Sequence, residues 1–230
     1  MANGRVARSR VGVLGSGEVG RRLAGAFRSR GHDVMIGSRD PAKPELREWL
    51  SGDGAGVEAG TFAQAAEHGE LLVLAVLGNA AEEAIADAGR DNFSSKVVID
   101  AMNPLDFSGG FPPKLSITGE DSLGERVQRA LPDARVVKAF NTIGNPYFLD
   151  PKFSEGEPTM LIAGDDEGAK RTVGDVLADF GWSNTWLAPP MRLWAAARWQ
   201  PRGITFTPQS TRGNRPLLSI RSDGPSIHIV

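Results

Sequence analysis

The sequence predicts an α/β fold built on a doubly wound, mostly parallel sheet and followed by an atypical C-terminal tail. Short apolar runs alternate with stretches of helical periodicity over the first 182 residues, which is the pattern of strands and helices in such a sheet. A glycine-rich turn joins the first apolar run to the first helix. The 230 residues are 40% hydrophobic, which is enough to form a core in one large or two small domains.

The glycine-rich turn has the spacing of a dinucleotide-binding fingerprint. Apolar residues 11–14 predict a buried strand, Gly15-x-Gly17-x-x-Gly20 follows it, and residues 18–30 have apolar positions at helical spacing. Gly15 permits a tight turn, Gly17 lets the backbone approach a pyrophosphate, and Gly20 lets the helix pack close to the strand. The sequence therefore predicts a Rossmann fold. The alternative is a tight strand-to-helix turn with no ligand.

The second predicted strand, residues 34–37, ends where such a fold meets the adenosine ribose of the dinucleotide. An NAD-selective site usually has Asp or Glu here, whereas this strand ends in Ser38 and Arg39, with Lys43 four residues further on. A hydroxyl and two cations suit the 2′-phosphate of NADP, which a carboxylate would repel. We therefore expect NADP selectivity. Asp40 lies beyond the turn and could cap the next helix, and the alternative is that Arg39 and Lys43 are ordinary solvated charges.

The remaining elements follow from local patterns. Thr61 and Gln64 have the spacing of a capping box, which predicts the start of a helix. The continuous apolar run over residues 71–77 is typical of a strand that is covered on both faces of a parallel sheet. Residues 105–118 are rich in Gly and Pro and predict a loop. The other predicted strands are a weak one near Val57 and residues 96–101, 135–140 and 159–163; the predicted helices are residues 44–50, 61–68, 80–88, 122–131 and 165–180.

Polar or turn residues follow three of the predicted strands, at Gly78-Asn79, Asn103-Pro104 and Asn141-Thr142. Ligands of open α/β sheets bind outside the carboxyl ends of the strands. The amides of Asn103 and Asn141 could therefore bond a nicotinamide carboxamide, a ribose or a substrate. Each residue alone is also a common turn former. Their recurrence at successive strand ends favours a shared site.

Composition limits the partners and the compartment. The formal net charge of −2 gives no argument for binding to nucleic acid or to a membrane surface. The chain has no cysteine, which rules out disulfides, thiolate metal sites and cysteine nucleophiles, and we expect no metal site. The first ten residues lack the apolar core of a signal peptide, and no apolar run approaches the roughly 20 residues that span a bilayer. We therefore expect a cytoplasmic protein.

Five motifs together resemble the NADPH-dependent reductases of the deazaflavin coenzyme F-420, over about residues 10 to 182. The resemblance extends to the NADPH domain of the STEAP-type metalloreductases, which continue into a membrane domain that is absent from this sequence. The motifs are Gly15-Ser-Gly-Glu-Val-Gly20, Ile36-Gly-Ser-Arg39 with Lys43, Asp100-Ala-Met-Asn-Pro-Leu105, Lys138-Ala-Phe-Asn-Thr-Ile143 and Ala163-Gly-Asp-Asp166.

This resemblance implies that NADP(H) lies along the strand ends, with coenzyme F-420 as a small-molecule co-substrate whose deazaflavin ring stacks on the nicotinamide. Hydride transfer between two such rings mainly needs them held face to face in a dry pocket, and we identify no catalytic acid or base. The implied cofactor-binding residues are Gly15, Ser16, Gly17, Glu18, Val19 and Gly20 around the pyrophosphate, Ser38, Arg39 and Lys43 at the 2′-phosphate, and Leu77, Asn103 and Asn141 near the nicotinamide. The expected substrate-binding residues are Asn103, Pro104, Asn141, Thr142 and Ile143.

Residues 183–230 differ in character from the rest of the chain. They contain six Arg, no Lys, a single acid (Asp223) and three of the five Trp. The resembled family has a helical segment here that helps to close the acceptor site and to build a homodimer. A frameshift would produce such a tail, which would then be poorly ordered; the alternatives are a genuine basic tail that binds a partner and an ordinary divergent C-terminus. We therefore divide the chain into an NADP-binding domain, residues 1–182, and a divergent tail.

These observations favour an NADP-dependent oxidoreductase that transfers a hydride between NADP(H) and a deazaflavin or a related flavin or quinone. A dehydrogenase of the 3-hydroxyacid or 6-phosphogluconate type needs a catalytic lysine on a second, all-helical domain, for which this chain is too short. The alternative function is a non-catalytic NADP-binding sensor, which would keep the fingerprint and lose the acceptor pocket.

Overall fold

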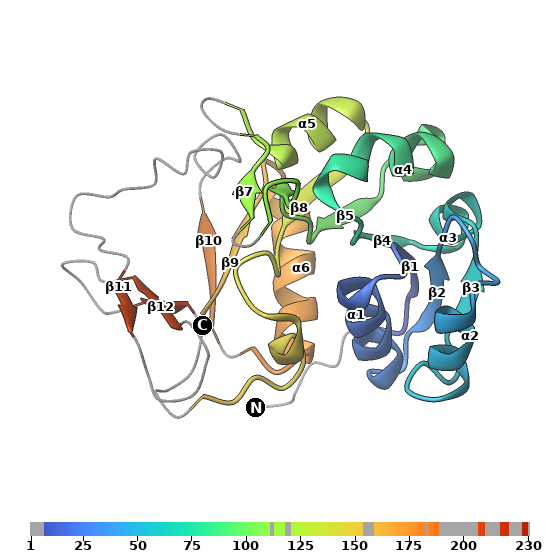
Figure 1. Cartoon of the computed structure of the whole chain (residues 1–230), viewed down its shortest axis with the longest axis horizontal. Coiled ribbons are helices and arrows are strands. Elements are labelled where there is room, and N and C mark those ends of the chain that lie inside the picture. Colours follow the sequence, from blue (N-terminus) through green and yellow to red (C-terminus); the bar gives the residue numbers. More distant parts are fainter. Residues whose placement is uncertain are drawn as a thin grey trace.

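The computed structural model describes residues 7–110, 113–117, 121–153 and 159–182, together with the backbone of residues 184–188, 207–209, 217–220 and 227–229. Its central element is an eight-stranded sheet with helices on both faces (Figure 1). The doubly wound α/β fold predicted from the sequence is confirmed. None of the helices in the described part of the chain is long and apolar enough to cross a membrane.

The strands of this sheet lie in the order β10-β9-β8-β5-β4-β1-β2-β3. Neighbouring strands from β8 to β3 are parallel, whereas β9 is antiparallel to β8 and parallel to β10. The order reverses between β1 and β4, so the carboxyl ends of these two strands flank the crevice where ligands of such folds bind. The bounds are β1 Arg10–Leu14, β2 Asp33–Gly37, β3 Glu58–Gly60, β4 Leu71–Leu74, β5 Val97–Asp100, β8 Arg135–Lys138, β9 Thr159–Ala163 and β10 Asn184–Ala188.

Each face of the sheet packs against its own set of helices, because residues of the strands point alternately to the two sides. On β4, Leu71 and Val73 belong to one hydrophobic core and Leu72 and Leu74 to the other. Figure 1 shows α1 and α6 on one side of the sheet and α4 and α5 on the other. The first core includes α1 Glu18–Ser29, α2 Pro44–Ser51 and α6 Glu167–Asp179; the second includes α3 Phe62–His68, α4 Ala81–Ala88 and α5 Leu123–Ala130.

Side-chain caps start three of these helices. The capping box predicted at α3 is confirmed: Thr61 Oγ1 accepts a hydrogen bond from Gln64 N at 3.2 Å, and Gln64 Oε1 accepts one from Thr61 N at 2.8 Å. Ser122 caps α5 and Asp166 caps α6 in the same way, each accepting a bond from a backbone N–H of the first turn. Each such cap contributes roughly 1 kcal/mol to stability. Short 3-10 helices cover Gly78–Ala80 (η1), Arg90–Phe93 (η2) and Asn145–Tyr147 (η3).

Two stretches differ from the sequence-based expectation. The apolar run predicted as a strand over residues 71–77 leaves the sheet after Leu74, because its neighbour β1 ends at Leu14 and the chain turns away at Gly15. The region predicted as a loop contains a short antiparallel pair, β6 Leu105–Asp106 and β7 Lys114–Leu115. Its backbone hydrogen bonds stabilise a hairpin that glycine and proline content alone does not reveal.

The segment set apart by composition, residues 183–230, is described only for the backbone of four strands. Strand β10 extends the large sheet by pairing with β9. Strands β11 Thr207–Gln209, β12 Leu217–Ile220 and β13 Ile227–Ile229 form a separate antiparallel sheet. The rest of the segment lies outside the described residues, so its expected disorder and the division at residue 182 stay predictions.

His32 is a buried titratable residue at the entrance to β2. Its Nδ1 accepts a hydrogen bond from Ser9 N at 3.3 Å, and its ring packs edge-on against Phe27 with centroids 5.5 Å apart. Burial lowers the pKa of His32 below its ordinary value of 6.5, because desolvation disfavours the imidazolium; the charge of Asp179 opposes this effect. The folded protein therefore holds His32 in its neutral form near neutral pH.

This burial predicts a pH dependence of stability. The unfolded chain takes up a proton on His32 near pH 6.5 while the folded chain does not, so the free energy of unfolding should fall as pH is lowered through this value. The loss should stop growing below the depressed folded pKa. In His32→Asn, whose Oδ1 can accept the same bond, this part of the slope should disappear. Urea unfolding between about pH 7.5 and pH 5.5 measures both slopes; equal slopes would show that His32 does not contribute.

Candidate nucleotide-binding site

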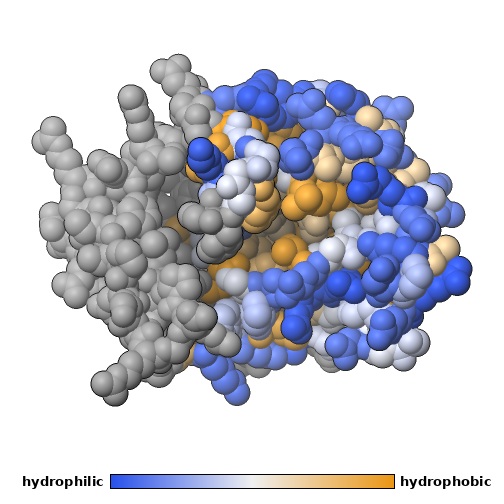
Figure 2. All heavy atoms as spheres, viewed as in Figure 1, coloured by the Kyte–Doolittle hydropathy of each residue, from blue (hydrophilic) through white to orange (hydrophobic). Residues whose placement is uncertain are grey.

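A cavity of about 390 Å³ lies over the carboxyl ends of the central strands. Figure 2 shows apolar surface gathered in and around the hollow in the middle of this face, surrounded by hydrophilic residues. It is lined by Gly15, Ser16, Gly17, Glu18 and Val19 after β1, by Ser38, Arg39 and Lys43 after β2, by Ala75, Val76, Leu77, Ala80, Glu83 and Ala84 after β4, by Ala101, Met102, Asn103 and Leu105 after β5, and by Phe62 and Asn145.

The turn after β1 owes its shape to three glycines with different roles. Gly15 has a φ of +125°, and a Cβ there would lie 2.4 Å from Ala75 O. A Cβ on Gly20 would lie 1.8 Å from Gly15 O, so only glycine lets α1 start this close to the turn. A Cβ on Gly17 would have no neighbour within 4 Å, which leaves open space beside the first turn of α1. Gly17 lines the cavity, whereas Gly20 is not among the lining residues.

A chain of hydroxyl groups connects this turn to the end of β2. Ser16 Oγ donates to Ser38 Oγ at 3.0 Å, and Ser38 Oγ donates to Asp40 O at 3.0 Å and accepts from Asp40 N at 3.2 Å. Both serines are buried. The side chain of Ser38 is therefore held in one orientation at the cavity wall.

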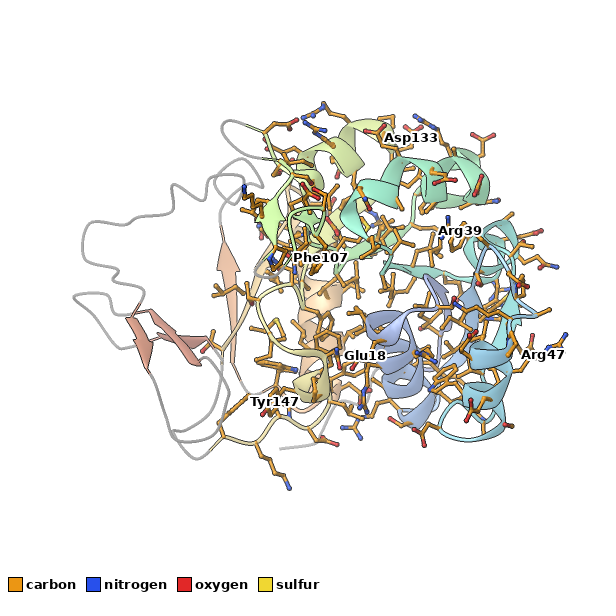
Figure 3. All side chains as sticks on the ribbon, in the orientation of Figure 1. Glu18, Arg39, Arg47, Phe107, Asp133 and Tyr147 are labelled. Carbon is orange, nitrogen blue, oxygen red and sulfur yellow. The ribbon has the colours of Figure 1, made fainter. Side chains whose placement is uncertain are left out.

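Two cations lie beside Ser38. Arg39 is exposed, Lys43 is half-buried, and both line the cavity (Arg39 is labelled in Figure 3). Neither forms an ion pair with an acid of the described residues. Asp40 accepts a bond from Ala42 N at 2.9 Å within the turn, and the N-cap of α2 is Lys43, so the suggestion that Asp40 caps that helix is wrong. Two positive charges thus lie in the cavity wall, and the acids of that wall, Glu18 and Glu83, form an ion pair with neither of them.

The opposite end of the cavity brings the ends of β4, β5 and β8 together. Leu77 and Asn103 line it, and Asn103 Nδ2 donates to Asn141 O at 3.0 Å. The Oδ1 atom of Asn141 is buried and has no hydrogen-bond partner among the described residues. The remaining predicted substrate-binding residues, Pro104, Thr142 and Ile143, are not among the lining residues, and neither is Asn141 itself. Their role stays a prediction.

Several lining residues were not singled out from the sequence. Ala75 and Val76 belong to the apolar run over residues 71–77, which continues past the end of β4 at Leu74. The length of this run gives no warning, because seven residues are within the usual range for a strand. Ala101 and Met102 lie between Asp100 and Asn103 in one of the five motifs, but their apolar side chains do not by themselves indicate a ligand. Asn145 reaches the cavity from η3, and no local pattern indicates this, because it depends on how the loop after β8 folds back over α1.

The two ends of the cavity differ in the chemistry that they offer. One end offers cations, serine hydroxyls and the backbone of a helix N-terminus, which suit phosphate groups. Around the other end, Leu77, Ala101, Met102 and Asn103 include no titratable side chain. Such a surface can hold and orient a planar ring but offers no acid or base. In the described part of the chain, no three His, Asp or Glu side chains gather to hold a metal ion.

Comparison with known proteins gives the family. The model of the family described as NADP oxidoreductase, coenzyme F-420-dependent, matches residues 10–104. An F-420-dependent NADP reductase of Methanothermobacter thermautotrophicus is 34% identical over 175 residues, covering 71% of this chain and 73% of the relative. Metalloreductase STEAP3 of Rattus norvegicus is 29% identical over 76% of this chain, which spans only 33% of that protein.

A solved structure supports the same assignment. The crystal structure of a proposed F-420-dependent NADP reductase from Arthrobacter sp. FB24 is 36% identical, with a TM-score of 0.77, and the match covers 81% of this chain and 87% of that one. A hypothetical protein from Sinorhizobium meliloti is 26% identical with a TM-score of 0.69, over 86% of this chain and 92% of that one. The chain therefore belongs to the family of coenzyme F-420-dependent NADP oxidoreductases.

Proposed function

We propose that the cavity binds NADP(H), with the 2′-phosphate of the adenosine ribose at Ser38, Arg39 and Lys43. The observation that carries this proposal is the pair of cations at the end of β2, which face the cavity without an acidic partner in the described chain. A phosphate dianion would neutralise them and accept bonds from the guanidinium and the ammonium. Ser38 Oγ would donate to the phosphate after its hydroxyl turns away from Asp40 O. NADH has only a 2′-hydroxyl at this position and no phosphate to pair with the cations.

The pyrophosphate is proposed to lie against Ser16, Gly17, Glu18 and Val19. The open space at Gly17 lets phosphate oxygens approach the backbone. The first N–H groups of a helix have no intrahelical acceptor, so those of α1 can donate to the phosphates, and the helix dipole favours negative charge there. From this point a dinucleotide that follows the strand ends reaches Leu77 and Asn103 with its nicotinamide.

The proposed reaction is hydride transfer between the nicotinamide and a deazaflavin, coenzyme F-420. The family and the name of the Methanothermobacter relative support this acceptor. Exposed apolar side chains support a planar aromatic partner: Leu77, which lines this end of the cavity, is 63% exposed, and Phe107, which follows β6 beyond the lining residue Leu105 and is labelled in Figure 3, is 52% exposed. Transfer between two stacked rings needs their orientation and no protein acid or base. A flavin or quinone would use the same surface.

The test is a two-signal measurement on the purified chain. Mixed with NADPH and oxidised deazaflavin, the protein should cause loss of deazaflavin absorbance, much faster than with NADH. The fluorescence of NADPH in the same sample reports binding. If the protein binds NADPH but shows no turnover with the deazaflavin, with a flavin or with a quinone, the proposed reaction is wrong and the protein is an NADP-binding sensor. Failure to bind NADPH would overturn the whole proposal.

Removal of the two cations should change cofactor preference. In Arg39→Ala with Lys43→Ala, the KM for NADPH should rise roughly 10- to 100-fold, because charge-assisted bonds worth about 1.5–3 kcal/mol are lost, while the KM for NADH should not rise. Arg47→Ala is the matched control, since Arg47 is an exposed arginine that points outward from α2 (Figure 3). Equal effects on NADPH and NADH would contradict placement of the 2′-phosphate here.

Substitutions of two glycines in the turn should affect NADPH binding and folding stability separately. Gly17→Ala should fold normally and lose at least about tenfold in NADPH affinity, because the new methyl group occupies space needed by the pyrophosphate. Gly20→Ala should instead lower the free energy of unfolding by about 1–3 kcal/mol, since its Cβ would overlap Gly15 O. Gly174→Ala on α6, where a Cβ also meets nothing within 4 Å, is the control for both. Titration by NADPH fluorescence and urea unfolding distinguish the two effects. Wild-type affinity for NADPH in Gly17→Ala would contradict the proposed position of the pyrophosphate.

A further inference from the structure

A buried ion pair lies beneath the end of the cavity that is lined by Leu77, Met102 and Asn103, where the nicotinamide and the hydride acceptor are proposed to meet. Asp100 and Lys138 are opposite each other at the ends of the neighbouring strands β5 and β8. Lys138 Nζ lies 3.1 Å from Asp100 Oδ2, and the side chains are 5% and 0% exposed, respectively. A buried pair of this kind is weak support for stability, because apolar residues of the same volume often stabilise a fold equally well or better. Its presence at a strand end therefore calls for another role.

Both members of the pair bond to the peptide groups of one residue. Asp100 Oδ1 accepts a hydrogen bond from Met102 N at 2.9 Å, and Lys138 Nζ donates to Met102 O. The regular ladder ends just before this point: Ala101 N bonds to Leu74 O and Ala139 N bonds to Asp100 O. The ion pair thus supplies the N–H and the C=O of Met102 with partners that the sheet does not provide.

Met102 connects the pair to the cavity. Ala101, Met102 and Asn103 all line the cavity, whereas neither Asp100 nor Lys138 does. Asn103 also bonds across to Asn141 O, and a Cβ on Gly78 would lie 2.5 Å from Asn103 O, so this segment is packed closely between the ends of β4 and β8. The chain also turns sharply after β8, where buried Phe140 has a φ of +65°. A shift of Met102 would therefore move the wall against which the nicotinamide is proposed to rest.

We propose that Lys138, acting through Asp100 and Met102, is a positioning residue that holds the 101–103 segment in place for hydride transfer. This inference rests on the proposed function for its kinetic consequence, but its structural part does not need a ligand. Neither charged group touches the reacting rings, so the pair acts on their geometry and not on a proton.

Three variants test this role. Lys138→Met removes the cation, Asp100→Asn keeps the shape of the side chain, and the double variant removes both charges. Lys170→Met is the matched control, because Lys170 is a buried lysine on α6 that pairs with Glu167 and is not among the residues that line the cavity. Hydride transfer in single turnovers should fall about 10- to 100-fold in Lys138→Met, the scale of loss expected for a small misplacement of reacting groups. Affinity for 2′,5′-ADP, which lacks the nicotinamide, should change less than about twofold.

The double variant separates positioning from stability. It should recover stability relative to Lys138→Met, since no unpaired charge is left buried, yet its hydride transfer should stay slow. Recovery of the rate along with stability, or a wild-type rate in Lys138→Met, would overturn the proposal.

A readout without ligand keeps this test independent of the proposed function. Amide exchange at Met102 should accelerate at least about tenfold in Asp100→Leu with Lys138→Met, which removes both partners of the Met102 peptide groups, but not in Lys170→Met, because the exchange rate follows local opening. Asp100→Asn keeps an acceptor oxygen for the Met102 N–H and is not used for this readout. Unchanged protection of Met102 would overturn the proposal even if the wild-type protein showed no turnover. Accelerated exchange without wild-type turnover would support the positioning role and refute only the proposed reaction.

Discussion

The close approach of α1 to the turn after β1 is the constraint on which the site depends. Gly20 leaves no side chain between the helix and Gly15 O, and Gly15 in turn has no side chain between β1 and Ala75. These two contacts bring the start of α1, the end of β1 and the end of β4 to one point. The sheet order reverses between the same two strands, so the crevice created by the topology opens where the helix N-terminus lies.

From this point the cavity extends in two directions with opposite character. Toward β2 it meets the fixed hydroxyl of Ser38 and two cations, and electrostatic attraction dominates. Toward β5 and β8 it meets apolar and amide groups, and shape dominates. The ion pair of Asp100 and Lys138 lies below this second end and outside the cavity. Both charges are buried there, and neither side chain lines the cavity where a ligand would bind. We infer that one half of the site selects the cofactor and that the other half orients the rings.

The sequence predicted those features that depend on local spacing. The fingerprint glycines, the capping box at Thr61, and Ser38, Arg39 and Lys43 lie within short segments whose geometry follows from the pattern itself. It did not predict that Ala75 and Val76 leave the sheet, because that depends on where β1 ends, nor that Asn145 returns to the cavity over α1. The antiparallel direction of β9 and the ion pair joining β5 to β8 also depend on tertiary pairing.

The central claim is that the strand ends hold a nicotinamide against a planar acceptor so that hydride passes directly between them. Transfer of isotope from NADPH carrying deuterium at C4 of the nicotinamide tests this most directly, in a reaction run in ordinary water with oxidised deazaflavin. With the labelled face matched to the bound orientation, we expect the deuterium at C5 of the reduced deazaflavin. NADPH deuterated on both faces should give one deuterium at C5 of the reduced deazaflavin and keep the other at C4 of NADP+. Reduced deazaflavin that carries only solvent hydrogen at C5 in that reaction would contradict direct transfer.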